Sequence, residues 1–107
     1  MEPVQRMAAL HVNDDQVLLL FKRGASVEPT VTPFGTIPPT DGGGRLHVAF
    51  GIRPADEDRW RSTLEAAGVE IESVVDWPEG GRSLYFRDPD GHAVELKTSN
   101  WRGQPLS

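Results

Sequence analysis

The chain has 107 residues, 37% hydrophobic and 25% charged, proportions typical of one ordinary globular domain, and it has no cysteine, which excludes disulfides and thiolate sites. A net charge of -5 without a Lys/Arg cluster argues against nucleic acid or an anionic membrane as a partner. The longest apolar run, residues 17–21, is too short to span a bilayer, and no signal peptide opens the chain, so we expect a cytoplasmic protein.

Residues 7–12 and 16–21 predict two strands joined by a turn at 13–15. Residues 6–22 align with residues 82–98 as a second hairpin with its turn in the same place, which indicates an internal repeat. In this alignment Leu19 falls opposite Glu95, so the first copy has no carboxylate at that position.

Residues 23–45 are rich in Pro, Gly and Thr and show no periodicity, which predicts a loop. Two interpretations remain open, a linker between half-domains and a lid over a pocket. In a lid, Phe34 would contact the ligand.

Residues 46–98 predict the order β-α-β-β-β. A strand at 46–52 precedes a helix at 55–67, which has acidic residues in its first turn and Gly68 at its end. A strand at 69–77 and a hairpin at 82–98 follow, the latter turning at D-P-D-G, residues 88–91. Alternation places His47 and Glu95 on one face of this sheet and the apolar side chains on the face toward the helix.

The segment Y-F-R-D-P-D-G-x-x-x-E-L, residues 85–96, resembles the closing hairpin of the vicinal oxygen chelate superfamily, which includes glyoxalase I, extradiol dioxygenases and fosfomycin- and bleomycin-resistance proteins. The resemblance implies an α+β fold of paired βαβββ modules forming a cup. It divides this chain into a partial first module at 6–22, a linker or lid at 23–45, a complete module at 46–98 and a tail at 99–107.

The resemblance also places His47 and Glu95 at metal-ligand positions, and a nitrogen and a carboxylate oxygen suit Fe, Mn, Ni or Zn. The family's other histidine lies on a first strand that has no counterpart here, so we expect a site that is incomplete in one chain. His11 and His92 do not match ligand positions.

Other residues on the polar face are candidates for contact with substrate. Tyr85 could donate a hydrogen bond and act with Glu95 in catalysis, and Arg87 could bind an anionic substrate group. The structural alternatives are that Tyr85 is a packed aromatic ring and that Arg87 forms a bond across the hairpin.

The first hairpin presents an apolar face without a helix to cover it: Ala8, Leu10, Val12, Leu18 and Leu20. Only six residues precede this hairpin, where the family pattern has a strand, a helix and a strand. We therefore expect a homodimer in which another chain covers this face, a truncated version of a longer ancestor, or both.

Three functions remain open. The first is a metal-dependent lyase or dioxygenase acting on a small oxygenated substrate. The second is a metal-free module that binds a small molecule, as antibiotic-sequestering relatives do. The third is a degenerate chain that mainly self-associates.

Overall fold

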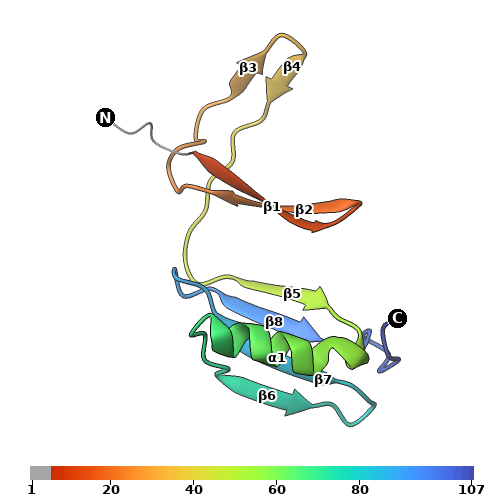
Figure 1. Ribbon diagram of the computed structural model, residues 1–107. Coiled ribbons are helices and arrows are strands. Elements are labelled where there is room, and N and C mark those ends of the chain that lie inside the picture. Colours follow the sequence, from red (N-terminus) through yellow and green to blue (C-terminus); the bar gives the residue numbers. More distant parts are fainter. Residues whose placement is uncertain (1–5) are drawn as a thin grey trace. The chain divides into compact units, whose positions relative to one another are not determined.

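The computed structural model describes residues 6–107, and the chain divides into two compact units, residues 1–43 and 44–107 (Figure 1). The first unit consists of two hairpins, and the second holds a four-stranded sheet with one helix. The predicted α+β class and the βαβββ order are confirmed.

In the first unit, β1 (Met7–Asn13) pairs antiparallel with β2 (Gln16–Phe21), with a bulge before the turn. Leu10 lies opposite Leu18, and Ala8 lies opposite Leu20, as the alternation predicts. Leu10 and Leu20 are 47% and 46% exposed. The apolar face of this hairpin is therefore open to solvent in the single chain.

The segment at 23–45, predicted to be a loop, contains a second, short hairpin. β3 (Thr30–Thr32) pairs antiparallel with β4 (Gly35–Ile37). The Thr32 hydroxyl accepts the Phe34 amide and donates to the Gly35 carbonyl, which closes the turn. Strands of three residues are too short for an alternating pattern to be visible in the sequence.

The sheet of the second unit has the order β5-β8-β7-β6. β5 (His47–Gly51) runs parallel to β8 (Ala93–Lys97), and β7 (Arg82–Arg87) pairs antiparallel with both β8 and β6 (Ser73–Asp76). β6 is shorter than the predicted strand at 69–77, because Val69 and Ile71 turn into the hydrophobic core before the pairing begins.

The helix covers one face of this sheet (Figure 1). A 3-10 turn, η1 (Pro54–Asp56), precedes α1 (Glu57–Ala66), so the predicted helix at 55–67 divides into two parts. At its end, Gly68 at φ +72 donates to the Glu65 carbonyl, and Val69 donates to the Leu64 carbonyl. This is a Schellman motif, which explains why the helix ends at this glycine.

The hydrophobic core lies between helix and sheet. Leu64 of α1 packs with Ile52, Leu84 and Leu96, and Leu84 is fully buried. One face of the sheet is thus used for stability, which leaves the opposite face available for chemistry. Within residues 6–107, no helix is long and apolar enough to cross a membrane.

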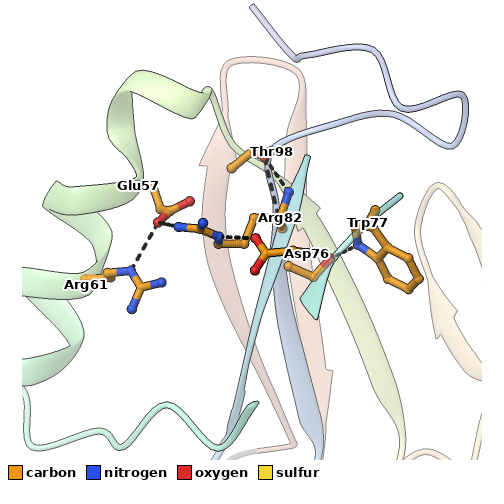
Figure 2. Close-up of polar contacts among 7 residues, drawn as sticks. Glu57, Arg61, Asp76, Trp77, Arg82 and Thr98 are labelled. Carbon is orange, nitrogen blue, oxygen red and sulfur yellow. Dashed lines mark hydrogen bonds and ion pairs between the residues drawn. The ribbon is translucent and has the colours of Figure 1, made fainter. Parts of the chain in front are cut away.

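Arg82 connects the start of the helix to the edge of the sheet, as Figure 2 shows. Its guanidinium donates to Glu57 Oε2 at 3.1 Å and to Asp76 Oδ1 at 2.6 Å, while Arg61 donates to the same Glu57 oxygen. Hydrogen bonds and charge from Asp76 and Glu57 raise the pKa of Arg82. The Arg82 amide also donates to the Thr98 hydroxyl, so β7 is held at the end where the tail begins.

Candidate metal centre

The structure brings His47 and Glu95 together on the face of the sheet opposite the helix. Glu95 lies opposite Ala49 of β5, which places it one pleat from His47. The distance from His47 Nε2 to Glu95 Oε1 is 3.0 Å. The Glu95 side chain is 7% exposed and that of His47 is 53% exposed. A buried carboxylate therefore meets a solvent-accessible imidazole, although 48 residues separate the two in sequence.

The second oxygen of the Glu95 carboxylate is also bonded. Ser83 Oγ lies 2.5 Å from Glu95 Oε2, and the indole Nε1 of Trp77 donates to Ser83 Oγ at 2.8 Å. Sequence reasoning did not predict these hydrogen bonds of Ser83 and Trp77. The available signal was that Ser83 shares the strand face of Tyr85, two residues further along β7.

Tyr85 lies directly across from Glu95 in the β7–β8 pairing. Its ring centroid is 6.1 Å from that of His47. Burial and, next, the charge of Glu95 raise the pKa of the Tyr85 phenol. The phenol is consequently neutral at physiological pH, when it has a proton to donate.

The other two predicted substrate contacts, Arg87 and Phe34, lie in different surroundings. Arg87 forms an ion pair with Glu72 at 3.2 Å and donates to the Gly91 carbonyl at 3.1 Å, so it is bonded across the hairpin. Phe34 belongs to the first unit, where it is 98% exposed at the β3–β4 turn.

A second cluster of donor atoms lies at the β7–β8 turn, where ligand atoms of Asp88, Asp90 and His92 are within 4.8 Å of one another. Turn formation accounts for this cluster. Asp88 Oδ1 accepts the amides of Asp90 and His92, and His92 Nδ1 accepts the Leu46 amide. His11 lies on β1 in the first unit.

The donor atoms of His47 and Glu95 fit a divalent transition metal. Two ligand atoms that each lie about 2.1 Å from an ion, with a right angle between the two bonds, are about 3.0 Å apart. This matches the distance between His47 Nε2 and Glu95 Oε1. Among the described residues of the second unit, no further His, Asp or Glu joins this pair in a group of three. Catalytic metal sites commonly use three protein ligands, so this pair accounts for part of such a site.

A cavity of about 230 Å³ is bounded by residues of the β6–β7 turn, β8 and the tail: Trp77, Glu79, Gly80, Lys97, Ser99, Asn100, Trp101 and Gly103. The Lys97 ammonium lies 5.2 Å from the centre of the Trp77 ring. Trp77 therefore links the cavity to the hydrogen bonds of Glu95, because its ring lines the cavity and its N–H contacts Ser83.

The fold and this pair define a single βαβββ module with a His/Glu site on its open face. A family model for the Glyoxalase/Bleomycin resistance protein/Dioxygenase superfamily matches residues 1–96. The chain belongs to this superfamily, which confirms the resemblance drawn from residues 85–96.

Similar proteins include the metallothiol transferase FosB of Bacillus licheniformis, 42% identical over 55 residues, which are 50% of this chain and 36% of that protein. The fosfomycin resistance protein FosX of Mesorhizobium japonicum is 42% identical over 53 residues, which are 49% of this chain and 38% of that protein. The matches thus span a little over a third of the length of these relatives.

Solved structures give a wider match. Lactoylglutathione lyase from Agrobacterium tumefaciens superimposes with a TM-score of 0.73 at 28% identity, covering 91% of this chain and 71% of that one. FosX from Listeria monocytogenes, solved with Mn(II) and sulfate, gives a TM-score of 0.50 at 30% identity, covering 60% and 56%.

Proposed function

We propose that the second unit holds a divalent metal ion through His47 and Glu95, and that the protein is a metal-dependent enzyme for a small oxygenated substrate. The 3.0 Å separation of His47 Nε2 and Glu95 Oε1 on the open sheet face carries this proposal. Similarity to the Mn(II)-containing FosX and to metallothiol transferases supports it. A bound ion would act as a Lewis acid that polarises a substrate oxygen.

The chain's own residues then have separate tasks. The neutral Tyr85 phenol, opposite Glu95, donates a hydrogen bond to the substrate. Arg87 binds an anionic substrate group by exchanging Glu72, and an exposed ion pair of this kind is worth only about 0–1 kcal/mol. The cavity beside Trp77 and Lys97 provides room for the remainder of a small molecule. Phe34 stays a predicted contact from the first unit.

The third metal ligand comes from outside the pair. We infer that a second copy of the chain supplies it. The exposed apolar face of the first hairpin supports association of two copies, because burying this face against another chain is favourable. Burying a leucine side chain contributes about 1.5–3 kcal/mol, so Leu10 and Leu20 together favour association. A two-fold symmetric dimer is the simplest closed arrangement.

A specific observation favours the metal-free alternative, in which the cup only binds a small molecule. Both oxygens of Glu95 already have partners, His47 and Ser83, so the buried carboxylate is satisfied without an ion. A metal ion would have to replace the hydrogen bond between His47 and Glu95.

Calorimetric titration with Mn(II), Ni(II) and Zn(II) distinguishes these functions. We expect binding weaker than micromolar in the single chain, lost in His47→Ala and in Glu95→Gln. The control is His92→Ala, which removes a histidine of the same unit that lies at the β7–β8 turn. Binding that survives both substitutions would show that the site is elsewhere, and no binding at millimolar metal would support the metal-free function.

A further inference from the structure

The Glu95 carboxylate ends a chain of hydrogen bonds whose direction is determined by its first donor. An indole N–H can only donate, so Trp77 Nε1 donates to Ser83 Oγ. The Ser83 proton is then directed at Glu95 Oε2, 2.5 Å away. An ionised carboxylate only accepts, so the bond at Glu95 Oε1 is donated by His47 Nε2.

Burial makes this arrangement rigid. Ser83 is 0% exposed and Glu95 is 6% exposed, so water does not replace either partner. An O–H···O⁻ bond of this length is among the strong, charge-assisted hydrogen bonds. Rotating the Ser83 hydroxyl away would leave a buried donor unpaired, which costs about 1–3 kcal/mol. Oε2 is therefore held by the protein, whereas Oε1 faces the half-exposed His47.

We propose that Ser83 and Trp77 are positioning residues that restrict Glu95 to binding a metal through Oε1 alone, so that the site selects transition metals over Ca²⁺. This inference rests on the proposed metal function. Calcium takes six to eight oxygen ligands and often a bidentate carboxylate, which a carboxylate with one oxygen occupied does not provide. Manganese, nickel and zinc accept a single carboxylate oxygen beside an imidazole nitrogen.

The test compares Ser83→Ala and Trp77→Phe with the wild-type chain by calorimetry with Mn(II), Ni(II) and Ca(II). We expect Ser83→Ala to lower the affinity for Mn(II) and Ni(II) about 10- to 100-fold, the usual effect of losing an outer partner of a metal ligand. Affinity for Ca(II) should stay the same or rise, because Oε2 becomes free for a bidentate contact, so the preference for Mn(II) over Ca(II) narrows. Trp77→Phe keeps the ring and removes only the N–H, and it should shift affinity in the same direction by a smaller factor. The matched control is Trp60→Phe, since Trp60 is also 38% exposed but lies on α1.

A spectroscopic measurement detects the positioning role separately from stability. Zn(II) should shift the Trp77 indole N–H resonance in the wild-type chain, leave that of Trp60 in place, and shift the Trp77 resonance less in Ser83→Ala. If Ser83→Ala does not fold, the metal affinity of Trp77→Phe is compared with that of the wild-type chain instead. Metal binding that is equal in wild type and both variants overturns this inference while leaving the proposed function intact. If the wild-type chain binds no metal, both are overturned.

Discussion

Replacing Glu95 by glutamine and by alanine separates the contribution of its charge from that of its shape. In Glu95→Gln, the amide oxygen can accept the Ser83 proton, and the amide nitrogen can donate to His47 Nε2. This requires only that the His47 proton move to Nδ1, which is easy because His47 is half exposed. All buried groups remain paired, so we expect the free energy of unfolding to change by less than about 1 kcal/mol.

Glu95→Ala has a different consequence, because it removes the carboxylate that accepts the Ser83 proton. An unpaired buried donor costs about 1–3 kcal/mol, and the lost methylene adds about 0.8 kcal/mol. The expected destabilisation is therefore about 2–4 kcal/mol, a large part of the roughly 5–15 kcal/mol typical of a domain. His47 loses little, since water can take the place of the carboxylate.

Urea denaturation of the metal-free protein, followed by tryptophan fluorescence, measures both changes. Metal binding should be absent in both variants, so Glu95→Gln is expected to lose function while it retains stability. If Glu95→Gln were as destabilised as Glu95→Ala, the charge of the carboxylate rather than its hydrogen bonding would stabilise the fold. The expectation that glutamine keeps the hydrogen bonds to Ser83 and His47 would then be wrong.

Three further predictions concern association, ionisation and the helix contact. Leu10→Asp or Leu20→Asp should convert a dimer into a monomer or unfold the protein in sedimentation at micromolar concentration, and a well-folded wild-type monomer would refute the dimer. Tyr85, the single tyrosine, should ionise above its ordinary pKa of about 10 when tyrosinate absorbance is followed, and Glu95→Gln should lower this pKa by removing one of its causes. Because the folded pKa is raised, the neutral Tyr85 contributes stability that is present below about pH 10 and is lost as pH rises through the folded value. Arg82→Ala should lower the melting temperature by an amount that shrinks at high salt, since it removes ion pairs to two carboxylates, and a salt-independent loss would point to packing instead.

The end of the helix and the β3–β4 hairpin show which features local sequence patterns can and cannot predict. Gly68 after an apolar stripe was enough to predict the end of the helix, because a left-handed residue there favours glycine on local steric grounds. The β3–β4 hairpin was missed, because its pairing depends on Thr32 bonding the turn and three-residue strands leave no periodic signal.

The sequence by itself determined which side chains share a face, since alternation along a strand follows from backbone geometry alone. His47 and Glu95 could therefore be placed on one face, and the resemblance to the family was drawn from residues 85–96. Only the tertiary structure decided their separation, because that depends on β5 pairing in parallel with β8, 46 residues later in the chain. It also decided that Ser83 and Trp77 hold the second oxygen of Glu95, since a side-chain hydrogen bond between neighbouring strands depends on register and rotamers that no local pattern records.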